Sequence, residues 1–223
     1  IYKYKYIYIF IFIYIFMKNL IIIIDLWEKA INDIKSLNTE YADLKVNNIL
    51  KLLSRVKDNN YFDFCNANYC DAKCSNNNEC RCANHGRKIL QSVIDMNINF
   101  KNMKSINPGI YDNVYLLGLS FDGCVLKRDL GFLNIKNRNK FVIKDCCLNE
   151  NPIRGNLQNK YFSQSENKED VIISNDCPQK WLKNGRIEWS GPYYYFKNTD
   201  AILKYENFIV KTMKLNTVTV ELI

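Results

Sequence analysis

The sequence has no concentrated basic region, although its formal net charge is +8. Its lysines are spread along the chain and are not gathered on one helix or interleaved with glycine and aromatic residues. Nucleic-acid-binding proteins usually carry such a gathered pattern, so we interpret these lysines as a solvated surface. The charge pattern disfavours nucleic acid as a partner, and a length of 223 residues suits one domain with a full hydrophobic core.

The sequence also lacks an uninterrupted hydrophobic run long enough to span a bilayer. Residues 1–16, IYKYKYIYIFIFIYIF, contain a signal-like apolar stretch, but no small-residue cleavage site follows it, and Lys18 and Asp25 bound the next apolar run. We expect residues 1–16 to be a low-complexity leader or an artefact of translating an untranslated region. The working protein would then begin at Met17 and be cytoplasmic. A secretory or membrane-anchored protein follows only if residues 1–24 are a real segment.

From Met17 onward, apolar β-branched runs alternate with segments of helical length. The run LIIIID is typical of a strand buried on both faces, which indicates a parallel sheet. The alternation predicts an open, mostly parallel α/β sheet with helices on both faces. The expected strands are 20–25, 60–67, 114–119, 140–146 and 169–174. An amphipathic helix is expected over 41–60, with Leu44, Val46, Ile49, Leu50, Leu53 and Val56 on its apolar face, and the segment 125–137 has helical length.

Three residues stand where predicted strands end: Asp25, Cys124 and Asp145. Ligand sites of open α/β sheets lie at the carboxyl ends of the strands, so these positions are candidates for chemistry. Each aspartate also suits a turn or a helix cap. Cys124 would lie at the start of a helix, where free backbone N–H groups and the helix dipole lower the pKa of a thiol. Gly123 would permit the tight turn that this position requires.

Residues 118–149, GLSFDGCVLKRDLGFLNIKNRNKFVIKDCCLN, resemble the isochorismatase-like cysteine hydrolases, a family that includes nicotinamidases and N-carbamoyl amidases. In that family a strand containing Gly leads through Asp to Cys-Val at the start of a helix, and the next strand ends in Asp. The matching residues here are Gly118, Asp122, Cys124, Val125 and Asp145. The run LIIIIDLW is similar to the family's first strand, and the resemblance covers about residues 17–174.

The resemblance implies a Rossmann-like layered fold and a Cys-Asp-Lys catalytic triad. Cys124 would be the nucleophile, Asp25 the proton acceptor and Lys88 the third member, with Lys101 and Lys104 as alternatives nearer to the cysteine. The implied reaction is hydrolysis of a small-molecule amide through a thioester, with no cofactor required for the chemistry and with a homo-oligomer expected. A nicotinamidase metal site would need an Asp and two His, and His85 is the chain's only histidine.

A second feature is a polar stretch rich in cysteine, which we expect to be an insertion at residues 62–86. Its candidate metal ligands are Cys65, Cys70, Cys74, Cys80, Cys82 and His85. Their spacings do not form the paired C-x2-C units of most zinc modules, so a zinc site, disulfides in an exported protein and free thiols all stay open. The odd total of 9 cysteines suits a reducing compartment with at least one free thiol.

The expected organisation is a hydrolase domain over residues 17–176 followed by an aromatic-rich extension over 177–223. The aromatic residues Trp181, Trp189 and 193–195 should pack a β-hairpin onto the domain or against a second subunit; the alternative is an exposed binding surface. Two functions remain open at this point. One is a cysteine hydrolase, and the other is a catalytically inactive relative that serves as a binding scaffold, with the Cys-rich loop as its functional part.

Overall fold

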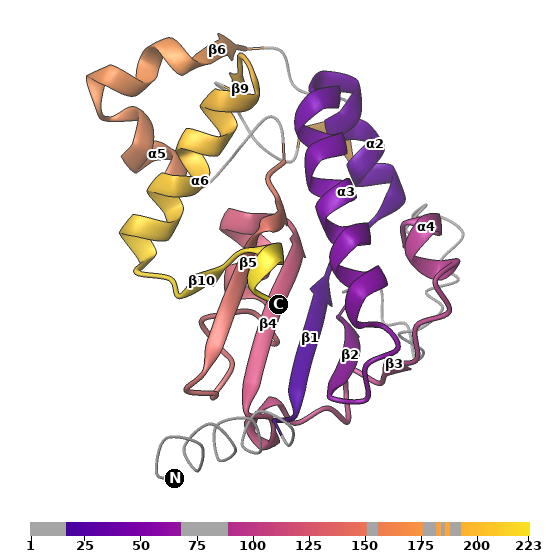
Figure 1. The fold of residues 1–223 in the computed structure, drawn as a ribbon. Helices are drawn as coiled ribbons and strands as arrows, with labels where there is room; N and C mark the ends of the chain where they lie inside the picture. The colour runs from indigo at the N-terminus through magenta and orange to yellow at the C-terminus, as the bar shows by residue number, and fades with distance from the viewer. Residues whose placement is uncertain (1–16, 68–88, 151–155, 176–181, 184–185, 188–192) are drawn as a thin grey trace, which may run out of the picture.

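A computed structural model describes residues 17–67, 89–150, 156–175, 182–183, 186–187 and 193–223. Six parallel strands form its central sheet in the order β10-β5-β4-β1-β2-β3 (Figure 1). The strands are β1 (Asn19–Ile24), β2 (Phe62–Ala67), β3 (Phe100–Lys101), β4 (Asn113–Leu119), β5 (Lys140–Leu148) and β10 (Thr217–Val218). Helices flank this sheet, so the predicted open parallel α/β fold is confirmed.

The central strand β1 owes its position to its composition. Residues 20–24 are almost fully buried, which requires covering layers on both faces and a neighbour on each side. Those neighbours are β2 and β4, which pair with all six residues of β1. The predicted strands over 60–67 and 114–119 are therefore present, and both flank β1.

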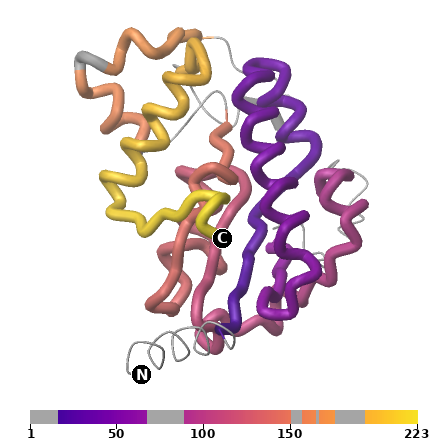
Figure 2. The backbone as a smooth tube through the Cα atoms, in the orientation of Figure 1, coloured from indigo at the N-terminus to yellow at the C-terminus, as the bar shows by residue number. Residues whose placement is uncertain are grey.

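The longest helix, α3 (Thr39–Val56), packs against the sheet, and Figure 2 shows the chain reaching it from β1 through α2 (Glu28–Leu37). Its N-cap residue Asn38 accepts a hydrogen bond of 3.0 Å from the Tyr41 backbone N–H, as N-cap residues commonly do. The remaining helical elements are α4 (Gln91–Ile94), α5 (Asn156–Phe162) and α6 (Thr199–Met213), with short turns at Pro108–Ile110, Ser165–Asp170 and Val220–Leu222.

The C-terminal part is integral to the fold. Strand β10 pairs with β5 as the edge strand of the central sheet, and α6 buries Ile202, Tyr205 and Ile209 in the common core. Residues 199–223, which the sequence placed in an extension beyond residue 176, thus share the sheet and the core of the preceding residues. Non-local β pairing of this kind leaves little trace in local sequence. The family resemblance, which covers about residues 17–174, therefore could not reveal the pairing of β10 with β5.

Short antiparallel pairs lie apart from the main sheet. The predicted strand at 169–174 is present as β6 (Val171–Ser174), but it pairs with β9 (Tyr193–Phe196). A second pair joins β7 (Leu182–Lys183) to β8 (Arg186–Ile187). Packing of an aromatic hairpin onto the domain or a second subunit stays a prediction. Trp181 and Trp189 lie outside the described residues.

The segment after β4 differs from the predicted long helix. A π-helical turn spans Phe121–Val125, and the helix ends at Lys127. The chain then turns at Gly131. A side chain would not fit there, because a Cβ would lie 2.8 Å from both the backbone N and the O of Arg128. The expected helix over 125–137 is therefore wrong, and a compact series of turns connects β4 to β5.

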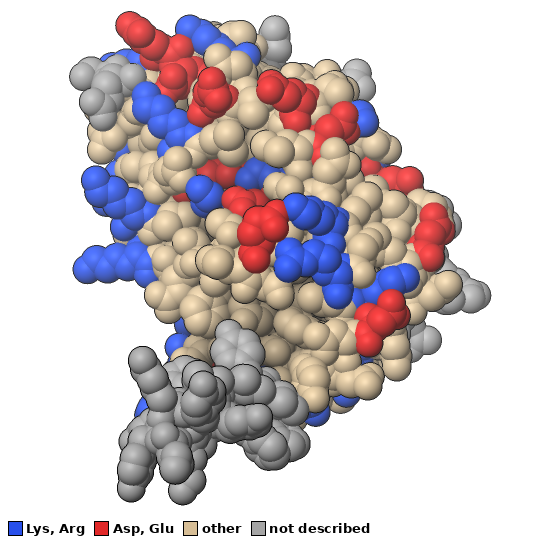
Figure 3. Space-filling view, in the orientation of Figure 1, with Lys and Arg blue, Asp and Glu red and all other residues tan. Residues whose placement is uncertain are grey.

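The molecular surface mixes charges of both signs. On the face shown in Figure 3, Lys and Arg alternate with Asp and Glu over the helices, as expected for a solvated surface. None of the helices in the described part of the chain is both long and apolar enough to cross a membrane.

Substitution of Gly118 tests the contact between β4 and β1. Gly118 has φ +127°, and a Cβ there would lie 1.9 Å from the Ile24 carbonyl oxygen. We expect Gly118→Ala to lower the free energy of unfolding by roughly 3–5 kcal/mol, because it combines backbone strain with overpacking. Denaturant unfolding measures this. The control, Gly109→Ala on the surface, should change stability by less than about 1 kcal/mol, and equal losses in both variants would contradict the assignment.

Candidate active site

The predicted pair Asp25 and Cys124 is brought together at the carboxyl edge of the sheet. Asp25 follows β1 directly, is only 4% exposed and adopts a left-handed backbone with φ +48°. Aspartate tolerates this conformation better than most residues. Cys124 lies on the π-helical turn after β4, the strand next to β1. Ile24 pairs directly with Gly118, so the two chain segments leave the sheet side by side.

The thiol and the carboxylate are in contact. The Asp25 carboxylate acts on the partly buried Cys124 thiol through its charge and a side-chain hydrogen bond, both of which raise the thiol pKa, and a hydrogen bond to the Ser120 backbone lowers it. The turn that carries Cys124 is fixed by Ser120 as well, because the Ser120 carbonyl accepts hydrogen bonds from the N–H groups of Gly123 (3.2 Å) and Val125 (3.0 Å).

The electrostatics of this pair correct one prediction. Burial raises the pKa of the Cys124 thiol to about 11, and the Asp25 carboxylate acts in the same direction, while the Arg128 guanidinium opposes them. The predicted lowering of this pKa is wrong, because the helix here is too short to supply a useful dipole and the nearest charge is negative. At neutral pH the thiol therefore keeps its proton, with a proton acceptor already hydrogen-bonded to it.

Lys88, the predicted third member, lies outside the described residues. The chain next to it in sequence runs beside the segment that follows Asp25. Ile89 forms an antiparallel bridge with Trp27, and the Leu90 backbone N–H donates to the Leu26 carbonyl at 3.2 Å.

The alternative lysines differ in their positions. Lys101 lies on β3, and its Nζ is 3.3 Å from Asp63 near the start of β2. This ion pair is near the amino ends of the strands, whereas Asp25 lies at their carboxyl ends. Lys104 is exposed, and its backbone N–H donates to the Asn102 side chain. Neither is seen to contact Asp25 or Cys124 in the described part of the chain.

The candidate metal ligands are mostly beyond what the structure describes. Cys70, Cys74, Cys80, Cys82 and His85 fall in the segment 68–88. Cys65 is described: it lies fully buried in β2, and burial raises the pKa of its thiol to about 12. Among the described residues, no group of three His, Cys, Asp or Glu side chains is placed to hold a metal ion. The zinc site stays a prediction.

The sequence suggested that Asp145 ends its strand, but it does not. Strand β5 continues to Leu148 and carries a bulge, since Val142 pairs with Leu116 but Cys147 pairs with Gly118. The bulge frees backbone carbonyls from the ladder. The Asp145 carbonyl accepts a hydrogen bond of 3.2 Å from the Asn48 side chain. Asp145 therefore lies within a strand and is not part of the site.

Asp122 holds the turn that carries Cys124 in place. Its carboxylate accepts hydrogen bonds from the Ser120 hydroxyl at 2.7 Å and from the Tyr205 hydroxyl of α6 at 2.9 Å. Its backbone N–H donates to the Asn149 side chain at 3.3 Å. Burial raises the pKa of Asp122, and the bonds from Ser120 and Tyr205 act against this. The side chain thus ties the turn to the C-terminal helix and to the end of β5.

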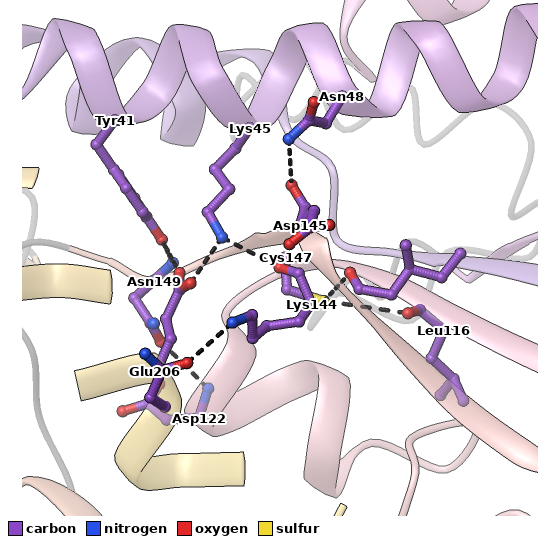
Figure 4. A network of polar contacts seen from close by, with 12 residues as sticks. Tyr41, Lys45, Asn48, Leu116, Asp122, Lys144, Asp145, Cys147, Asn149 and Glu206 are labelled. Atoms are coloured by element: carbon purple, nitrogen blue, oxygen red, sulfur yellow. Dashed lines mark hydrogen bonds and ion pairs between the residues drawn. The ribbon is translucent and has the colours of Figure 1, made fainter. Parts of the chain in front are cut away.

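A buried ion pair extends this network, as Figure 4 shows. Lys45 of α3 and Glu206 of α6 are 2.6 Å apart with side chains 2% and 0% exposed. Lys45 also donates to the Lys144 carbonyl in the β5 bulge at 3.1 Å. Tyr41 donates to Glu206 at 2.6 Å and accepts from the Asn149 backbone N–H at 2.8 Å. Sequence reasoning missed these residues, because Lys45 fits the polar side of a helix and Glu206 is distant in sequence.

Comparison with known proteins finds no match among protein-family models, curated proteins or solved structures. The resemblance to isochorismatase-like hydrolases therefore rests on the residues of this chain.

Breaking the buried ion pair tests the network. We expect Lys45→Met to lower the free energy of unfolding by about 3–5 kcal/mol, because it leaves the Glu206 carboxylate buried without its cation. The double variant Lys45→Met/Glu206→Leu should recover most of that loss, as measured by denaturant unfolding.

The exposed pair of Lys51 and Glu221, with side chains 53% and 69% exposed, provides the matched control. Lys51→Met should cost less than about 1 kcal/mol. If Lys45→Met were as mild as this control, Lys45 and Glu206 would not form a buried pair in solution.

Proposed function

We propose that the protein is a cysteine-dependent hydrolase of a small amide or a related substrate. The observation that carries the proposal is the hydrogen bond between the Cys124 thiol and the Asp25 carboxylate at the carboxyl ends of two adjacent parallel strands. A nucleophile hydrogen-bonded to its own base is the arrangement that covalent catalysis requires. Open α/β sheets place their sites at this edge.

The proposed reaction begins with proton transfer from Cys124 to Asp25. The sulfur then attacks the amide carbonyl carbon, and the Cys124 backbone N–H stabilises the oxyanion. Asp25 returns the proton to the leaving amine, which departs and leaves a thioester. Water, deprotonated by the same carboxylate, attacks the thioester and releases the acid and the free thiol.

The roles of the remaining predicted residues follow from the resemblance. Lys88 would stabilise the thiolate and its paired carboxylate electrostatically. The chemistry requires no cofactor, and a homo-oligomer stays an expectation. Asp122 supports the proposal indirectly, because its bonds to Ser120 and Tyr205 fix the turn on which Cys124 lies.

Ammonia release from a panel of small primary amides, including nicotinamide, tests the function. We expect protein starting at Met17 to release ammonia from at least one member, and Cys124→Ala to lose the activity completely, because the covalent path needs the sulfur. The matched control is Cys146→Ala, which removes a buried thiol from β5 and should keep the activity.

Two results would contradict the proposal. One is equal release by wild type and Cys124→Ala. The other is no release from any amide by protein whose circular dichroism shows it to be folded, which would favour the non-catalytic scaffold.

A further inference from the structure

Arg128 lies against the proposed base. Its Nε is 3.4 Å from Oδ2 of Asp25, and its side chain is 36% exposed while that of Asp25 is 5% exposed. The Arg128 backbone N–H donates to the Cys124 carbonyl at 3.1 Å. The arginine thus follows the nucleophile by one turn, directly after the helix ends at Lys127.

The turns that follow hold Arg128 in this position. The Gly131 N–H donates to the Arg128 carbonyl at 2.7 Å, and the Asn134 side chain donates to the carbonyls of Lys127 and Arg128, both at 2.9 Å. The Phe132 N–H returns to the Val125 carbonyl at 2.9 Å. These turns therefore hold the Arg128 carbonyl by two hydrogen bonds and the neighbouring carbonyls of Lys127 and Val125 by one each.

We infer that Arg128 is a further catalytic residue, whose guanidinium stabilises the negative charge that passes from Asp25 to Cys124. This inference rests on the proposed function. In the resting site the charge is on the carboxylate. When the S–H bond breaks and an O–H bond forms on Asp25, the charge moves to sulfur. The Arg128 guanidinium, a fixed cation beside Asp25 and Cys124, lowers the energy of the thiolate without having to move.

The described charged groups that act on the thiol are few. Asp25 raises the pKa of Cys124, and Arg128 lowers it. Asp122, on the same turn, directs its carboxylate to Ser120 and Tyr205. Lys88 lies outside the described residues, so the experiment compares variants that all retain it.

The test measures the rate of alkylation of Cys124 by iodoacetamide between pH 7 and 10, quantified on the peptide that contains this residue. Below the thiol pKa this rate is proportional to the thiolate fraction, so the displacement of the pH profile between two variants gives the shift of its midpoint. We expect Arg128→Gln to move the midpoint of the pH profile upward by about one unit and to slow alkylation at pH 8 about tenfold. Arg128→Met, a second neutral side chain, should do the same, so the test does not depend on one variant folding.

Arg138→Gln is the matched control, because it removes the same charge from an exposed position outside the site. It should leave the midpoint unchanged. An unshifted midpoint in the folded Arg128 variants, or an equal shift in Arg138→Gln, would overturn the inference. Because alkylation needs no amide substrate, a shifted midpoint in a protein that hydrolyses no amide would retain the Arg128 contact and reject only the hydrolase function.

Discussion

The close approach of β4 to β1 is the contact on which the site depends. Gly118 pairs with Ile24 in register, and there is no space for a side chain between Gly118 and the Ile24 carbonyl. The next residues of the two strands therefore emerge together, and the chain must turn at both points. Asp25 turns through a left-handed conformation, and Cys124 is presented on a π-helical turn. Backbone packing inside the sheet thus decides which side chains meet at its edge.

Buried polar contacts then fix the turn at that edge. Asp122 is bonded to Tyr205, and Glu206, the next residue of α6, is bonded to Lys45 and Tyr41, so one turn of α6 connects the segment that carries Cys124 to α3. Such a network is favourable only when its members are well paired, because an unpaired buried charge is costly. The bulge in β5 contributes by exposing the Lys144 carbonyl to Lys45. The C-terminal helix therefore supports the site as well as the core.

The sequence predicted the features that depend on local composition. The β-branched run at 20–24 indicated a buried central strand, and the residues after two strands, Asp25 and Cys124, proved to be in contact. Features that depend on tertiary packing were not predictable. In α3 the apolar pattern placed Leu44 on the buried face, yet Leu44 is 42% exposed and Lys45 is 1% exposed, because Glu206 is available to pair with Lys45. The thiol pKa was misjudged since burial outweighs the effect of a short helix.

The most direct measurement of the central claim is the pH dependence of Cys124 alkylation in Asp25→Asn. Asp25 raises the pKa of this thiol, so removing the carboxylate charge should lower it below the value of about 11 in the unaltered protein. Alkylation at pH 8 should then be faster in the variant than in the unaltered protein. An unchanged or higher midpoint in folded Asp25→Asn would contradict the pairing of Asp25 with Cys124.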